Sequence, residues 1–245
     1  MVIEIAANSL LSSLNAQEGG AARIELCSDL ELGGITPSAG LIRKVRAALE
    51  IPVFVLIRPR SGDFIYSDLE FETMLADIEF CKSEGINGIV TGFLDEHANI
   101  NVERLQKVIE VADQMPVTFH RAFDLTGSAT QSLKVLKDCG IQRVLTSGQK
   151  SNAIEGRFLI KQLIEEAKND IIIMPGSGVN ENNIIPLSEF TGAREFHTSS
   201  RVRIKSQMTH LNRDLLLSSN NEIPEHDYYI SDLQKIKKVV NSFAS

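Results

Sequence analysis

The stretch PVTFHRAFDLTGSATQSLKVL, residues 116–136, contains the unit from which this fold is built. Residues 116–120 form a short apolar run that predicts a strand, and a polar loop follows them. Ser128 then precedes Leu133 and Leu136, whose spacing is typical of one face of a helix. A strand, a loop and a helix in this order predict part of a parallel βαβ arrangement.

The same unit recurs along the chain. Short apolar runs predict eight strands, at residues 2–6, 22–26, 53–57, 87–91, 116–120, 142–146, 170–174 and 193–197. Helix starts are expected at residues of the types that cap helix N-termini, namely Ser9, Ser38, Ser67, Asn101 and Ser128. Eight strand–helix repeats within 245 residues predict an α/β protein with a single (β/α)8 TIM-like barrel.

An open doubly wound sheet is the alternative fold. Such a sheet often has a glycine-rich turn after its first strand, and the loop after residues 2–6 lacks those glycines, which favours the barrel. We expect one domain over residues 1–245. Residues 205–227 are polar and break the repeat, so they are expected to form an inserted loop before the last helix. Residues 228–245 are expected to supply the closing helix and tail, with the helix at 230–240.

Composition and charge exclude several classes of protein. The chain has 25 Lys and Arg against 32 Asp and Glu, a net charge of −7, which argues against nucleic-acid binding. No run approaches the roughly 18 apolar residues of a membrane span. The N-terminus lacks the basic region of a signal peptide, and the 3 cysteines are scattered and odd in number. We therefore expect a cytoplasmic protein with no membrane and no nucleic-acid partner.

The candidate acid–base residues lie at expected strand ends, where barrel enzymes place their chemistry. Glu4 and Glu25 interrupt apolar strands, and His120 and Asp124 follow the strand at 116–120. Two carboxyl groups beside cations can have pKa values pushed apart, and a histidine can act as a general base. The alternative is a buried ion-pair network that only orders the barrel.

Candidate anion-binding residues come from the same end of the expected barrel. Guanidinium groups suit carboxylate and phosphate, and backbone N–H groups after the last two strands form the common phosphate site of barrel enzymes. These candidates are Arg58, Arg60, Arg121, Ser147, Gly148, Gly176, Gly178, Ser199 and Ser200. The alternatives are salt bridges to Asp63 or Asp124 for the arginines and tight turns for the glycines.

Candidate metal ligands are few. Copper(I) prefers cysteine and methionine, and Cys27 is the cysteine placed at the expected barrel mouth. With His120 and His197 it would form a metal-binding set. An oxygen-and-imidazole site made of Glu4, Glu25 and His120 would suit a harder ion.

Five motifs occur in order: ELC (residues 25–27), GGITPS (33–38), IRPR (57–60), TFHRAFD (118–124) and VLTSG (144–148). Through them the sequence closely resembles the copper homeostasis protein CutC family, from residue 1 to about residue 203. The resemblance implies a TIM-like barrel, a cytoplasmic location, a homo-oligomer and a role in copper handling, with the copper ion as a ligand.

The chain departs from the family pattern at two positions. Relatives often carry cysteine where this sequence has Ala6 and Thr198, so Cys27 is left without two soft neighbours.

Two functions stay open. One is a copper-associated protein that binds or buffers the ion. The other is an enzyme of lyase or isomerase type that acts on a small anionic metabolite, for example a phosphorylated one.

Overall fold

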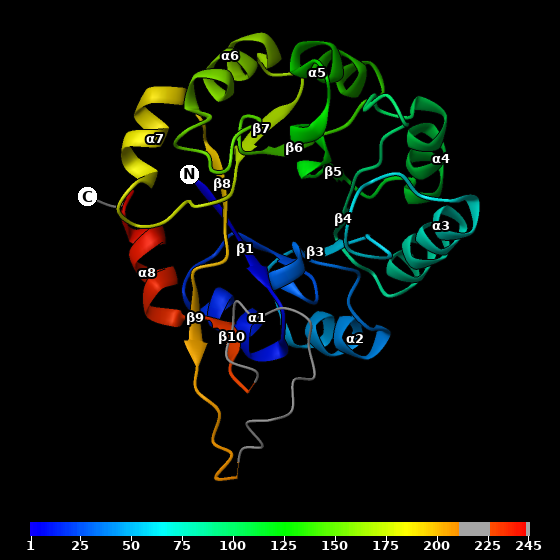
Figure 1. Ribbon diagram of the computed structural model, residues 1–245. Coiled ribbons are helices and arrows are strands. Elements are labelled where there is room, and N and C mark those ends of the chain that lie inside the picture. Colours follow the sequence, from blue (N-terminus) through cyan, green and yellow to red (C-terminus); the bar gives the residue numbers. More distant parts are fainter. Residues whose placement is uncertain (211–225, 244–245) are drawn as a thin grey trace.

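The computed structural model describes residues 1–210 and 226–243. Eight parallel strands form one sheet: β1 (Val2–Ala7), β2 (Arg23–Leu26), β3 (Val53–Leu56), β4 (Gly88–Thr91), β5 (Val117–Phe119), β6 (Arg143–Thr146), β7 (Ile172–Pro175) and β8 (Glu195–Thr198). They are hydrogen-bonded in the order β7-β6-β5-β4-β3-β2-β1-β8. Because β7 and β8 also contact each other, the sheet forms a nearly closed ring (Figure 1). The predicted (β/α)8 barrel is confirmed.

Helices surround this ring (Figure 1). They are α1 (Leu10–Glu18), α2 (Ala39–Ala48), α3 (Asp68–Ser83), α4 (Val102–Ala112), α5 (Ala129–Asp138), α6 (Arg157–Ala167), α7 (Ile184–Thr191) and α8 (Leu233–Asn241), with short 3-10 turns at Leu30–Leu32 and Arg121–Leu125. Within the described residues, none of these helices is both long and apolar enough to cross a membrane.

Local sequence explains where the helices begin. Each predicted cap side chain accepts a hydrogen bond from the backbone N–H three residues further on, and so satisfies a donor that has no partner within the helix. These caps are Ser9, Ser38, Ser67, Asn101 and Ser128. At α3, Glu70 also accepts from the backbone N–H of Ser67, which completes the expected capping box.

Alternation along the strands separates two environments. On β2, Ile24 and Leu26 belong to the apolar core between the sheet and the helices. Arg23 alternates with them and pairs with charged groups of β1 and β8, which places it inside the barrel. The ring of Phe54 also lies inside, where Gly88 leaves room for it. Arg23 and Phe54 thus fill the interior of the barrel near the amino ends of the strands.

The last part of the chain differs from the prediction. The strand β9 (Arg201–Ile204) pairs antiparallel with β10 (Tyr228–Ser231), so residues 228–231 are not helical. The closing helix α8 starts at Leu233, capped by Asp232, rather than at 230. Ser231 explains the difference, because its hydroxyl donates to the carbonyl of Ala6 and its N–H donates to Ser12, both of which favour an extended backbone there. Of the expected inserted loop, residues 211–225 lie outside the described part of the chain.

Candidate active site

A cavity of about 490 Å³ lies at the carboxyl ends of the strands. Glu25 from β2 and His197 from β8 line it, together with side chains that follow β3 and β5 and the loops that follow β7 and β8. This is the end of the barrel where the sequence placed its candidates. Glu4 of β1 does not line the cavity but contacts His197, which does, and it is fully buried.

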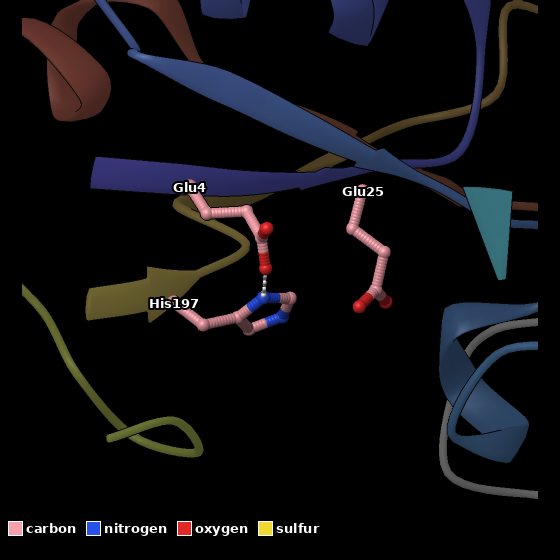
Figure 2. Close-up of side chains that lie close together, drawn as sticks. All are labelled: Glu4, Glu25 and His197. Carbon is pink, nitrogen blue, oxygen red and sulfur yellow. Dashed lines mark hydrogen bonds and ion pairs between the residues drawn. The ribbon is translucent and has the colours of Figure 1, made fainter. Parts of the chain in front are cut away.

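The registers of β1 with its two neighbours place Glu4 directly between a histidine and an arginine. Glu4 is opposite His197 on β8 and opposite Arg23 on β2. Its Oε1 lies 2.7 Å from Nδ1 of His197 (Figure 2), and its Oε2 accepts from Nε of Arg23. Burial alone would raise the pKa of Glu4, but the charges and hydrogen bonds of these two partners lower it to about 2. Glu4 is therefore ionised at neutral pH.

A second ion-pair cluster extends from Arg23. Its Nη2 lies 2.7 Å from Oε2 of Glu195, and Nε of Arg143 lies 2.7 Å from the same oxygen. Sequence analysis missed Arg23, Arg143 and Glu195. The available signal was the spacing of two between Arg23 and Glu25 and between Glu195 and His197, which puts both members of each pair on one face of a strand.

Glu25 has no such partners. Its Oε2 is buried and makes no hydrogen bond to any described residue. Burial, with the nearby charge of Glu4, raises the pKa of Glu25 to about 7, although the positive charges of His197 and Arg23 oppose this shift. Burial would lower the pKa of His197, but the carboxylates of Glu25 and Glu4 raise it overall. Glu25 is thus able to take up and release a proton near neutral pH.

His120 is held in one tautomer. Its Nδ1 accepts a hydrogen bond of 3.1 Å from the N–H of Ala122, so the ring proton lies on Nε2 when the ring is neutral. That Nε2 is buried without a partner among the described residues. Burial, and then the charge of Arg58, lower the pKa of His120 to about 3. At neutral pH the ring therefore presents an N–H donor and no charge.

The arginines differ in what they contact. Arg58 donates to three carbonyl oxygens of its own and the preceding loop, and its Nε lacks a partner in the described structure. Arg60 forms ion pairs of 3.0 Å with Asp63 and 2.6 Å with Glu70 and does not line the cavity. Arg121 does line the cavity, next to its ion pair of 2.8 Å with Asp124. Arg60 and Arg121 thus form the alternative salt bridges to Asp63 and Asp124, whereas Arg58 contacts backbone carbonyl oxygens.

Asp124 is engaged with the loop after β6. It accepts from the N–H groups of Ser147 and Gln149 in addition to Arg121, so its lone pairs are occupied. The N–H of Gly148 donates to the side chain of Thr146. Asp124, Ser147 and Gly148 accordingly hold this loop in shape, and none of the three lines the cavity.

The loops after β7 and β8 form the opposite wall. Gly178, Ser199 and Ser200 line the cavity, whereas Gly176 supports His197 from beside it. A Cβ atom at position 176 would lie 2.5 Å from Cδ1 of Leu145 and 3.4 Å from Cβ of His197. The Oγ atom of Ser200 is buried and has no partner in the described part of the chain.

The residues able to hold a metal ion differ from the predicted set. Among the described residues, one group of at least three His, Cys, Asp or Glu side chains has its ligand atoms within 4.8 Å of one another, and it consists of Glu4, Glu25 and His197 (Figure 2). The expected grouping of Cys27 with His120 and His197 does not form. Carboxylate and imidazole donors suit Cu²⁺ or Zn²⁺ rather than copper(I).

Cys27 is poorly suited to a thiolate copper site. It is fully buried, and its Sγ lies 3.8 Å from the carbonyl oxygen of Ala7. Burial, followed by the charges of Glu25 and other acidic residues, raises its pKa well above the usual range. Ala6 and Thr198 line the cavity, but neither side chain is a soft ligand.

Known proteins of one family are similar to this chain in sequence and in fold. The model of the CutC family matches residues 1–202. The human copper homeostasis protein cutC homolog is 43% identical over 236 residues, which are 96% of this chain and 86% of that protein. A family protein CutC from Parabacteroides distasonis is 42% identical over 240 residues, covering 98% and 99% of the two chains. The crystal structure of the copper homeostasis protein CutC from Streptococcus agalactiae has a TM-score of 0.78 at 32% identity, and the match covers 81% of this chain and 98% of that one.

Proposed function

Since this chain belongs to the CutC family, whose relatives are named copper homeostasis proteins, we propose that it serves copper homeostasis through an enzyme-like site that transfers protons on a small anionic metabolite. One observation carries the proposal. Four buried polar atoms without partners in the described structure belong to residues that line one cavity, namely Oε2 of Glu25, Nε of Arg58, Nε2 of His120 and Oγ of Ser200.

Such atoms are costly unless something bonds to them. An unsatisfied buried donor or acceptor costs roughly 1–3 kcal/mol, so a fold rarely keeps four in one place without a reason. A ligand with one hydrogen-bond donor and two acceptors would satisfy the atoms of Glu25, Arg58 and His120 when Glu25 is ionised, and the hydroxyl of Ser200 can either donate or accept. The charged rim supports an anionic ligand, because Arg121, Arg201 and Lys235 line the same cavity.

Anion binding is tested with inorganic phosphate as the probe and heat stability as the readout. We expect phosphate to raise the melting temperature of the wild type, and Lys235→Gln to reduce this shift. Lys237→Gln is the matched control, since Lys237 is on the same helix and pairs with Glu18 at 3.3 Å instead of lining the cavity. No phosphate effect, or an equal effect in both variants, would contradict an anion site here.

Direct copper binding is the second candidate function, and the grouping of Glu4, Glu25 and His197 favours it. Both oxygens of Glu4 already have partners, so the open donors are Oε2 of Glu25 and Nε2 of His197. Glu4 would then orient the imidazole, as carboxylates do for metal-bound histidines.

A titration of the reduced, metal-free protein with copper(I) and Cu²⁺ against a competing chelator separates the two kinds of site. Loss of one-to-one Cu²⁺ binding in Glu25→Gln, with binding kept in Cys27→Ser, would support the carboxylate–imidazole site. Loss of copper(I) binding in Cys27→Ser would support a thiolate site instead. Absence of tight binding in the wild type would leave the anionic metabolite as the ligand.

We place the protein in the cytoplasm as a homo-oligomer. The free thiols of Cys27, Cys81 and Cys139 suit a reducing compartment. Leu11 and Leu14 of α1 and Tyr228 of β10 expose apolar side chains on elements that contact each other, which is the kind of surface that a second copy would cover. Light scattering after gel filtration measures the assembly, and Leu11→Glu should shift it toward the monomer.

A further inference from the structure

We propose that the metabolite is a small α-hydroxy carbonyl compound whose carbonyl oxygen accepts a hydrogen bond from Nε2–H of His120, while Glu25 moves the proton of the neighbouring carbon. This inference rests on the proposed function and names the substrate class and the two residues that act on it.

The backbone decides which nitrogen of His120 carries the proton. The N–H of Ala122 donates to Nδ1, and an N–H cannot donate to a nitrogen that is itself protonated. The ring lies between Phe64 and Phe119, at centroid distances of 4.8 and 6.2 Å. Because Nε2 has no partner among the described residues and His120 lines the cavity, its proton is available to a ligand there.

The position of the ring depends on Gly92. A Cβ atom at position 92 would lie 2.5 Å from Nδ1 and 2.6 Å from Cε1 of His120. Only a residue without a side chain therefore allows the imidazole to pack where it does.

An uncharged hydrogen-bond donor can stabilise negative charge on a carbonyl oxygen. Burial and the guanidinium of Arg58 keep His120 uncharged at neutral pH. A neutral imidazole that donates to a carbonyl oxygen stabilises the negative charge that develops when a proton leaves the neighbouring carbon. Arg58 adds a fixed positive charge on the same wall of the cavity.

Glu25 supplies the base from another strand. It is on β2, whereas His120 follows β5, so a ligand in the cavity meets the two groups from different sides. The Glu25 carboxylate takes the proton from the hydroxyl-bearing carbon, and the electron pair of that C–H bond forms the C=C bond of an enediol(ate). The carbonyl electrons move to oxygen, where the His120 hydrogen bond holds them. The proton of the hydroxyl group then moves to the former carbonyl oxygen. Glu25 returns its proton to the former carbonyl carbon while the new C=O bond forms at the former hydroxyl-bearing carbon, which completes an aldose–ketose exchange with no other reactant.

Imine chemistry has weaker support. It needs a lysine whose amine can reach a carbonyl carbon, and Lys235 is the one lysine among the described residues that line the cavity. Its Nζ donates to the carbonyl oxygen of Arg201 at 3.0 Å, and it comes from α8 rather than from a strand end. Proton transfer therefore fits the residues present better than Schiff-base formation does.

The first test is the protonation state of His120 itself. In protein labelled with ¹⁵N at histidine, we expect the His120 signals of a neutral ring protonated on Nε2 at pH 7. His120→Gln identifies the signals. A charged ring, or a ring protonated on Nδ1, would overturn the assignment of His120 as the carbonyl donor.

The second test uses two probes, inorganic phosphate and phosphoglycolohydroxamate, which mimics an enediolate that carries a phosphate. We expect the hydroxamate to bind the wild type at least about tenfold more tightly than phosphate, and His120→Ala to lose about tenfold or more for the hydroxamate alone. His120→Gln, which keeps an N–H donor, should recover part of that loss.

The outcomes separate the two proposals. If phosphate binds, but the hydroxamate binds no more tightly and its affinity is unchanged in the His120 variants, the substrate class is wrong while the anionic site stands. If neither probe binds the folded protein, the proposed function fails together with the further inference.

Discussion

Nδ1 of His197 lies 2.7 Å from Oε1 of Glu4, although 193 positions separate the two residues in the chain. The contact exists because β8 and β1 are neighbours in the barrel and their register puts these residues directly opposite each other. Burial lowers the pKa of His197, but the charge of Glu25 and this contact with Glu4 together raise it. The contact also directs the other ring nitrogen away from Glu4 (Figure 2). The floor of the site is thus a pre-oriented imidazole beside the unpaired Glu25 carboxyl.

Glu4→Gln should destabilise the fold strongly. The change removes the carboxylate partner of His197 and one of the two carboxylate partners of Arg23, which keeps Glu195. Breaking a buried pair from one side costs about 3–5 kcal/mol. Urea denaturation at pH 7 measures the loss. Glu18→Gln is the control, because its ion pair with Lys237 is exposed and should contribute roughly 0–1 kcal/mol. Equal effects of the two substitutions would contradict the role given to Glu4.

Acid should lower the stability of the fold by protonating Glu4. The pKa of Glu4 is lowered from 4.5 to about 2, so its contribution to stability is present above pH 4.5 and is lost as the pH falls through about 2. We expect the free energy of unfolding of the wild type to fall over this range more steeply than that of Glu4→Gln. Denaturation curves at several pH values check this, and parallel profiles for the two proteins would contradict it.

The effect of Glu25→Gln on stability should have the opposite sign to that of Glu4→Gln. The pKa of Glu25 is raised from 4.5 to about 7, so stability from its neutral form is fully present below pH 4.5 and is lost as the pH rises through about 7. At pH 8 the wild type carries an ionised buried carboxyl, and the variant should gain on the order of 2–3 kcal/mol relative to the difference at pH 4.

The same substitution should abolish proton transfer. A gain in stability with a loss of activity is expected where a residue is kept for function rather than for folding. A Glu25→Gln protein whose stability relative to the wild type is the same at pH 4 and pH 8 would show that this carboxyl is not held in its neutral form.

Gly92→Ala should disturb the site through His120. The new methyl group would overlap the imidazole, so the ring must move out of its position next to Ala122. We expect altered ¹⁵N signals of His120 and loss of tight hydroxamate binding, with phosphate binding kept. Gly127→Ala is the matched control, because a Cβ atom there meets no heavy atom within 4 Å. Unchanged His120 signals in Gly92→Ala would contradict this account.

The three cysteines should differ in reactivity. Cys27 and Cys81 are fully buried, and burial raises the pKa of Cys81 to about 12, whereas Cys139 is partly exposed at the end of α5. A disulfide reagent at pH 8 should therefore modify Cys139 in the folded protein and all three thiols after unfolding. Rapid reaction of Cys27 in the folded state would reopen the thiolate copper site.

Much of the fold could be predicted from local signals. The strands lie within two residues of the predicted runs, and Ser67 with Glu70 forms the expected capping box, because both features depend on residues close in sequence. The hairpin of β9 and β10 was missed because its stability comes from Ser231, whose partners Ala6 and Ser12 are more than 200 positions away.

The candidate site was predicted only in part. Glu25, His120, His197 and the loops after β7 and β8 do line one cavity. Asp124 instead bonds to the loop after β6, and Arg60 pairs with Asp63 of its own loop and with Glu70 of α3. A residue type and a place at a strand end do not reveal whether another side chain already occupies its hydrogen-bonding groups.

The amino-acid sequence by itself determined the alternation of strands and helices, the barrel that follows from it, and the end of the barrel where polar groups gather. These depend on periodicity and capping, which act over a few residues. Only the tertiary structure decided that Glu4 is bound between Arg23 and His197 while Oε2 of Glu25 has no hydrogen-bond partner among the described residues. That choice depends on the registers of β8, β1 and β2 and on closure of the sheet, which bring together residues from both ends of the chain.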